Sequence, residues 1–204
     1  MGKVTLWMQM SLDGIADSAD KVSWPVVDEE LYQPYLDDLC AAEAFLYGRR
    51  TYEQMASFWP QADEEPAISE FYVDFARCWK KTPKFVISRT LDVVDWNTRV
   101  LRGNPIEQVA ALKAETKGDL IVFGGPRTAT PLMRYGLIDD YHLFIHPIVL
   151  GHGTSLFPRA GIEPPLNLID VTSFPSGVAR VHYQQPPAHR HRTWSPGPEP
   201  DRVV

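Results

Sequence analysis

The chain has 204 residues, 44% of them hydrophobic, which is enough for one domain with a sizeable core. A net charge of -6 argues against a general binder of nucleic acids or anionic membranes. There are two cysteines, no CxxC motif and no apolar run of membrane-spanning length. The sequence therefore predicts a cytoplasmic protein without a disulfide scaffold or a thiolate metal site.

Apolar periodicity predicts strands and helices that alternate over the first 140 residues. Strands are expected at residues 4–10, 44–47, 84–87, 120–123, 141–150, 166–174 and 178–183, and helices at 28–40, 50–58, 68–79, 105–116 and 127–135. Pro34 is expected to kink or delay the first helix. The order predicts a three-layer α/β fold, with a mostly parallel central sheet, antiparallel C-terminal edge strands and helices on both faces.

The composition changes near the C-terminus. Residues 1–185 carry the predicted elements and are expected to form the single domain. Residues 186–204 are rich in proline and have little to bury, so they are expected to form a disordered tail.

Three early strands are followed by the same kind of residues: glycines or hydroxyls, then arginines. The segments are Gly48-Arg49-Arg50-Thr51, Ser88-Arg89-Thr90 and Gly124-Gly125-Pro126-Arg127-Thr128. Ligands of open α/β sheets bind outside the carboxyl ends of the strands, where helix N-termini and arginines attract phosphate. Each segment alone is a weak signal, and neither GxGxxG nor a Walker loop is present. Together they predict a site for a multiply phosphorylated ligand such as a dinucleotide.

The sequence resembles the dihydrofolate reductase superfamily, and most of all the small stand-alone proteins similar to the C-terminal reductase domain of the bifunctional riboflavin biosynthesis enzyme. The matching segments are MSLDG (10–14), LYGRRTYE (46–53), KFVISRTL (84–91) and IVFGGPRTATPLMRYGLIDDYHLFIHPIVLGHGTSLFP (121–158). The resemblance covers residues 3 to about 184. It implies a dihydrofolate-reductase-like fold and an NADPH-dependent reductase.

The resemblance also implies a set of cofactor-binding residues. Gly48, Arg49, Arg50 and Thr51 would hold the pyrophosphate, and Gly124, Gly125, Arg127 and Thr128 would form a turn and a helix N-terminus against the phosphates. Ser88 and Arg89 would bind the adenosine 2′-phosphate, which favours NADPH over NADH. Met8, Gln9 and Ala16 would lie near the nicotinamide.

Two acids are candidates for the proton source. Glu29 follows Trp24 at the spacing between a loop tryptophan and the acid of dihydrofolate reductases, although an acid there can also serve the helix dipole. Asp13 is expected either to lie in the cleft with a raised pKa or to shape the turn at Gly14. Trp24 and Trp59 could stack on a flat substrate ring.

His142, His146 and His152 lack the spacing of a metal site and are expected to be strand or interface residues, so no metal is predicted. The sequence has no HxE or PCxxC motif, hence no zinc deaminase domain. A homodimer is expected on the C-terminal strands, because 141–150 is apolar on both faces and the following hairpin adds edge strands. The family resemblance also points to dimers.

The leading hypothesis is an NADPH-dependent oxidoreductase that reduces a C=N or C=O bond of a small pyrimidine- or pterin-like substrate. The nearest known activity would be the 5-amino-6-(5-phosphoribosylamino)uracil reductase of riboflavin biosynthesis. A true dihydrofolate reductase is one alternative. A non-catalytic nucleotide-binding module is another, and cofactor binding without turnover across a substrate panel would favour it.

Overall fold

The structure, a computed structural model, describes residues 2–17, 29–65, 68–157 and 165–186. The predictions for Trp24 and for the tail beyond residue 186 lie outside these residues. The strands are β1 (Val4–Ser11), β2 (Ile15–Asp17), β3 (Ala44–Gly48), β4 (Lys84–Ile87), β5 (Thr98–Leu101), β6 (Leu120–Phe123), β7 (Asp140–His146), β8 (Thr154–Ser155), β9 (Asn167–Ser173) and β10 (Ala179–Gln184). The helices are α1 (Glu29–Tyr32), α2 (Leu36–Cys40), α3 (Arg49–Ala62), α4 (Glu70–Lys81), α5 (Pro105–Glu115) and α6 (Pro126–Arg134), with a 3-10 turn at Gln33–Tyr35.

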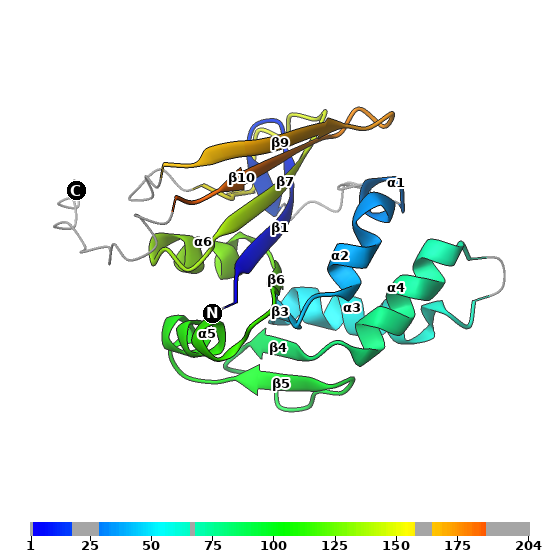
Figure 1. The fold of residues 1–204 in the computed structure, drawn as a ribbon, viewed down its shortest axis with the longest axis vertical. Helices are drawn as coiled ribbons and strands as arrows, with labels where there is room; N and C mark the ends of the chain where they lie inside the picture. The colour runs from blue at the N-terminus through cyan, green and yellow to red at the C-terminus, as the bar shows by residue number, and fades with distance from the viewer. Residues whose placement is uncertain (1, 18–28, 66–67, 158–164, 187–204) are drawn as a thin grey trace, which may run out of the picture.

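The central layer is an eight-stranded sheet in the order β5-β4-β3-β6-β1-β7-β10-β9 (Figure 1). The strands from β5 to β7 run parallel, and β10 and β9 are antiparallel additions beyond β7. Strand β1 lies in the middle, paired with β6 on one side and with β7 on the other. This arrangement confirms the predicted mostly parallel sheet with antiparallel C-terminal edge strands.

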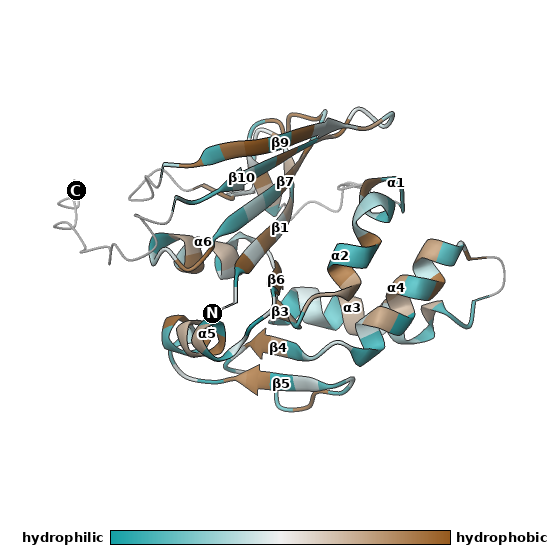
Figure 2. Ribbon diagram, viewed as in Figure 1, coloured by the Kyte–Doolittle hydropathy of each residue, from teal (hydrophilic) through white to brown (hydrophobic). Residues whose placement is uncertain are grey.

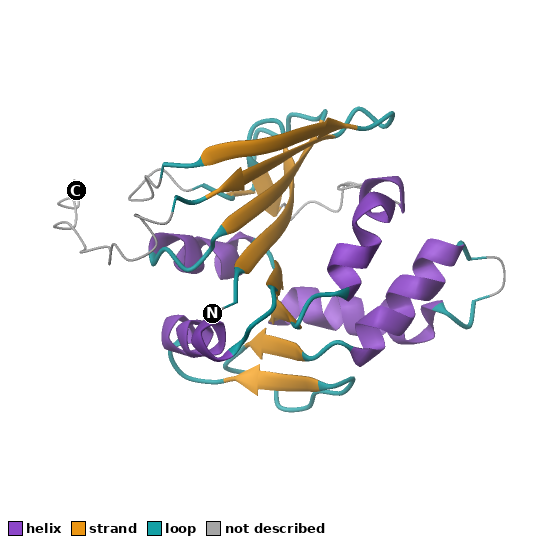
Figure 3. Ribbon diagram, in the orientation of Figure 1, coloured by secondary structure: helices purple, strands orange, loops and turns teal. Residues whose placement is uncertain are grey.

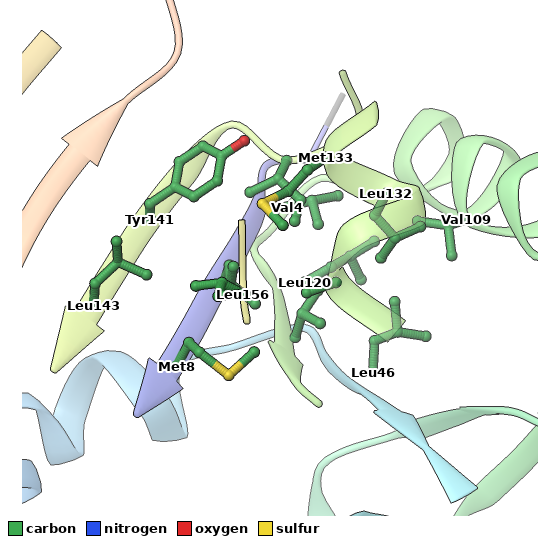
Figure 4. Packing of buried hydrophobic residues seen from close by; sticks show 14 of the residues in the cluster. Val4, Met8, Leu46, Val109, Leu120, Leu132, Met133, Tyr141, Leu143 and Leu156 are labelled. Carbon is green, nitrogen blue, oxygen red and sulfur yellow. The ribbon is translucent and has the colours of Figure 1, made fainter. Parts of the chain in front are cut away.

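Helices cover both faces of the sheet, with α5 and α6 on one face and α1 to α4 on the other (Figure 3). Because successive strand residues point to opposite faces, each core strand contributes to two cores. Val4 and Leu6 of β1 pack with α5 and α6, whereas Trp7 packs with α1 and α4. Figure 4 shows the first of these cores, where Leu120 of β6 lies among the side chains of α6.

The structure departs from the sequence-based predictions in several places: the short strands β2 and β8 were not predicted, and α3 continues to Ala62, past the predicted residue 58. Pro34 lies in the 3-10 turn, which divides the expected single helix into α1 and α2. Strand β7 ends at His146 instead of residue 150, because Pro147 has no N–H for a sheet hydrogen bond and Ile148 N bonds back to His146 O. The short strand β5, TRVL, was not predicted at all. No helix in the described ranges is long and apolar enough to cross a membrane.

Candidate active site

A cavity of about 980 Å³ lies at the carboxyl ends of β1, β3 and β6. It brings together most of the residues singled out in the sequence: Met8, Gln9, Ala16, Gly48, Arg49, Arg50, Thr51, Trp59, Gly124, Gly125, Arg127 and Thr128. These residues come from five separate segments. They meet because the carboxyl ends of parallel strands share one edge of the sheet.

Two helices begin at this cavity. Helix α3 follows Gly48 and helix α6 follows Gly125; neither start has a side-chain cap or an acid in its first turn. The first N–H groups of a helix have no partner within the helix and carry the positive end of its dipole. Arg50 and Arg127 form no ion pair with a described residue, while Arg49 contacts the exposed Glu53 at 3.3 Å. This end of the cavity therefore attracts anions.

The glycines at the strand ends serve two different structural purposes. A β-carbon on Gly48 would collide with Oγ1 of Thr128, and one on Gly124 would lie 3.1 Å from the Thr128 β-carbon. These two glycines allow α6 to pack closely on β3 and β6. A β-carbon on Gly125 would meet nothing within 4 Å and would enter open space at the cavity. Only Gly125 thus leaves room for a ligand at the start of α6.

Ser88 and Arg89 are not among the residues that line the cavity, although the preceding Ile87 is. The buried Ser88 hydroxyl accepts hydrogen bonds from the N–H groups of Thr90 (3.2 Å) and Leu91 (3.0 Å). It thereby stabilises the turn after β4. Arg89 is exposed beside this turn.

Asp13 also lies outside the lining of the cavity. Its carboxylate accepts hydrogen bonds from the Ser11 hydroxyl (2.6 Å), from Leu150 N (3.1 Å) and from Gly151 N (2.7 Å). The bond from Ser11, followed by those from Gly151 and Leu150, lowers the pKa of Asp13 to about 2. The expectation of a raised pKa is therefore wrong, because these donors stabilise the charged form. At neutral pH Asp13 is an anion that joins the loop after β1 to residues 150–151.

Glu29, the other candidate acid, is exposed at the start of α1 and does not line the cavity. Its carboxylate accepts a hydrogen bond from the hydroxyl of Ser69, the residue before α4. This contact connects two helices on the same face of the sheet. The structure assigns Glu29 a place between α1 and α4 and not beside the predicted nicotinamide position.

The sequence did not single out Tyr32 on α1, a further polar residue that lines the cavity. Gln9 Nε2 donates to the Tyr32 hydroxyl at 2.7 Å, and Gln9 Oε1 is hydrogen-bonded to His146 Nε2. Since an amide nitrogen can only donate, the Tyr32 proton is available to another acceptor. Burial raises the pKa of Tyr32 to about 12, with the Gln9 bond opposing the rise. Tyr32 therefore keeps its proton at neutral pH.

Asp17 on β2 is the one carboxylate that lines the cavity among the described residues, and the sequence did not indicate it either. No local motif distinguishes Asp17 from the acids around it. Its place follows from the pairing of β2 with β8, which holds residues 15–17 beside the end of β1.

The far end of the cavity is aromatic and is formed by α3 and α4. Trp59 stacks on Tyr72 with ring centroids 5.7 Å apart and meets Phe75 edge-on at 4.5 Å. Phe58 contacts Trp59 at 5.0 Å and is 46% exposed. Trp59 lines the cavity, and its stacking on a substrate ring stays a prediction.

His142 of β7 belongs to the packing of the sheet, whereas His146 at the end of the same strand contacts Gln9. His142 stacks on Trp7 with centroids 4.6 Å apart and accepts a hydrogen bond from Arg180. Burial, together with the neighbouring Arg180 charge, lowers the pKa of His142 to about 3, so its ring is neutral. No cluster of three or more metal-ligating side chains occurs within the described ranges.

The order of strands and helices gives the protein a dihydrofolate-reductase-like fold. A dihydrofolate reductase from Enterococcus faecalis, complexed with NADP(H) and RAB-propyl, superposes with a TM-score of 0.60 at 12% identity, over 90% of this chain and 96% of the other. A Shewanella sp. PV-4 protein described as a riboflavin biosynthesis protein superposes with a TM-score of 0.65 at 20% identity, over 91% and 99%.

Among proteins of this fold, the chain belongs to the RibD C-terminal domain family, whose pattern it matches over residues 2–180. The uncharacterized protein YyaP of Bacillus subtilis (strain 168) is 28% identical over 185 residues, which cover 89% of this chain and 94% of YyaP. The match confirms the resemblance inferred from the strand-end motifs.

Proposed function

We propose that the protein is an NADPH-dependent oxidoreductase that reduces a C=N or C=O bond of a small heterocyclic substrate. The observation that carries the proposal is the division of one cavity into two ends. One end has two uncapped helix starts and three arginines, and the other is lined by aromatic rings. Family membership and the fold of NADP(H)-bound relatives support the same activity.

The residues present fit a dinucleotide. Open space in front of Gly125 lets a phosphate approach the backbone, and Arg50 and Arg127 have their charges free of other described ion pairs. Arginine gives bidentate contacts to phosphate oxygens, which suit a pyrophosphate. Met8, Gln9 and Ala16 line the same cavity, and the nicotinamide ring is proposed to lie beside them.

NADPH supplies a hydride when bound, and the protein must supply the proton. Tyr32 is the proposed donor, in place of Asp13 and Glu29, because Tyr32 lines the cavity and its hydroxyl carries a proton that Gln9 Nε2 does not accept. His146 holds the Gln9 amide, so Gln9 can continue to donate to the Tyr32 oxygen after the proton has left. The arrangement orients the donor and stabilises its charged form.

Arg89 provides the test of cofactor identity. If its guanidinium binds the 2′-phosphate from the rim of the cavity, Arg89→Ala should reduce the preference for NADPH over NADH about ten-fold or more. Loss of one charge-assisted phosphate contact accounts for this magnitude. Both cofactors are titrated by quenching of tryptophan fluorescence in the variant and in the wild type.

Arg99→Ala is the matched control, because Arg99 is an exposed arginine of β5 whose guanidinium lies over the Phe85 ring. It should leave the preference unchanged. An Arg89→Ala variant with the wild-type preference would contradict the assignment of Arg89. Absence of binding for both cofactors to the wild-type protein would contradict the proposed function itself.

The proposed assembly is a homodimer built on β9. Strand β7, which the sequence analysis expected at the interface, cannot pair with a second chain, because β1 and β10 flank it within one chain. Strand β9 is the sheet edge, and Leu168, Ile169 and Val171 on it are more than half exposed (Figure 2). An uncovered apolar edge strand favours pairing with another chain. Light scattering at micromolar concentration should give a dimer mass for the wild type and a monomer mass for Ile169→Lys. A monomer mass for the wild type would contradict the proposed dimer.

A further inference from the structure

We infer that the aromatic end of the cavity takes a flat, uncharged aromatic ring and not a phosphorylated substrate. This inference rests on the proposed function and narrows its substrate class. It separates this chain from a reductase of phosphoribosyl pyrimidines, although the chain belongs to the RibD C-terminal domain family.

The first argument is the chemistry of the aromatic end. The residues that line it are apolar or aromatic with few polar groups: Leu39, Met55, Phe58, Trp59, Phe71, Tyr72 and Phe75. The polar atoms nearby are the side-chain amide of Gln54 and the hydroxyls of Tyr32 and Tyr72, all neutral. Aromatic walls of this kind stack on a planar ring, and neutral donors and acceptors can pair with the polar edge of a heterocycle.

The second argument is the distribution of charge along the cavity. The cationic side chains in its described lining are Arg49, Arg50 and Arg127, all in the first turns of α3 and α6. Trp59 lies nine residues beyond Arg50 on α3, about 14 Å at a rise of 1.5 Å per residue. Arg49 and Arg50 thus begin helix α3, whereas Trp59 lies in its last turn, and Arg127 belongs to α6 on the other face of the sheet.

Among the described residues, Lys80 is a further cation near the end of α3, and its charge is already paired. Lys80 of α4 forms an ion pair with Asp63 at 2.7 Å and does not line the cavity. A phosphate buried against Phe58, Trp59 and Tyr72 would lose its hydration without gaining a counter-charge from the described lining of this end, which is strongly unfavourable. An uncharged ring loses little on entering and gains stacking contacts.

The matched probes are 1-naphthol and 1-naphthyl phosphate, which differ by the phosphate group alone. Both are titrated by calorimetry into protein saturated with NADP⁺, so that the arginine end is already occupied. The uncharged probe should bind at least ten-fold more tightly than the phosphate ester. Equal or tighter binding of 1-naphthyl phosphate, or no binding of 1-naphthol, would overturn the inference.

Variants of the aromatic residues test where 1-naphthol binds. Phe58→Ala and Trp59→Ala should each weaken 1-naphthol binding about ten-fold, the usual effect of one stacked ring. Phe58 is half-exposed, so its replacement should not impair folding. Trp96→Ala is the control, since Trp96 is a partly exposed tryptophan that does not line this cavity. Unchanged affinity in both cavity variants would also overturn the inference.

NADP⁺ saturation is measured first, which separates the two proposals. If NADP⁺ fails to bind, the proposed function fails, and the probes are then compared on the free protein. If NADP⁺ binds and the phosphate ester is preferred, the cofactor assignment stands and the substrate class is wrong.

Discussion

Gly125→Ala is expected to weaken NADPH binding at least ten-fold while lowering the melting temperature by only a few degrees. The added β-carbon meets no protein atom within 4 Å, and the Gly125 backbone angles, φ -69° and ψ 175°, are allowed for alanine. The expected cost in stability is a lost N-cap preference of less than about 1 kcal/mol. The methyl group would instead stand where a phosphate approaches the first N–H groups of α6.

The two neighbouring glycines give the contrast. Gly48→Ala and Gly124→Ala place the same methyl group against Thr128, so they should lower the melting temperature as well as cofactor affinity. Thermal unfolding and a fluorescence titration with NADPH on the three variants separate the two effects. Wild-type affinity in Gly125→Ala would show that no phosphate lies at the start of α6.

Tyr32→Phe is expected to lower kcat about 100-fold or more while NADPH affinity stays at the wild-type value. Phenylalanine preserves the ring that lies beside Trp7, with centroids 6.0 Å apart, and removes only the proton donor. Loss of a positioned general acid typically costs 10²-fold or more. The assay is NADPH oxidation with the fastest substrate from a panel of dihydrofolate and unphosphorylated C=N and C=O heterocycles.

Two acid variants test the alternatives. Asp17→Asn removes the carboxylate that lines the cavity, and Asp13→Asn removes the one outside it. With a pKa of about 2, Asp13 is protonated in about one molecule in 10⁵ at pH 7, too few for an efficient donor. Tyr32 is the wrong assignment if Asp17→Asn or Asp13→Asn abolishes turnover and Tyr32→Phe does not.

The pH profile gives a second criterion. A Tyr32 donor stays protonated up to its pKa of about 12, so kcat should be level between about pH 5 and 9. A carboxylic acid donor would instead lose its proton, and kcat would fall, as the pH rises through its pKa.

Cofactor binding with no turnover for any substrate of the panel would favour the alternative of a non-catalytic nucleotide-binding module.

The lowered pKa of Asp13 affects the stability of the folded state. A carboxylate whose pKa is lower in the folded state than in the unfolded state stabilises the folded state at every pH above its unfolded pKa. This stabilisation by Asp13 disappears as the pH falls through about 2. The hydrogen bonds to Leu150 N and Gly151 N thus anchor the loop after β1 throughout the neutral range.

The sequence by itself determined the architecture and the arginine end of the cavity. Continuous apolar runs such as 44–47 and 120–123 specify strands buried on both faces, and the helices expected between them indicate parallel crossovers. Parallel strands end at one edge, so Gly48, Gly125 and the arginines after them must come together. The edge strand β5 was not predicted, because TRVL is short and follows a turn at Trp96 and Asn97 with positive φ angles.

Only the tertiary structure decided the hydrogen-bond partners of Tyr32 and the lowered pKa of Asp13. Gln9 meets Tyr32 across 23 residues of sequence and His146 across 137, and Asp13 meets Gly151 across 138. A pKa depends on which donors and charges surround a group in three dimensions, and no local spacing encodes those partners. The same holds for the aromatic end, where the packing of α3 against α4 brings Trp59 onto Tyr72.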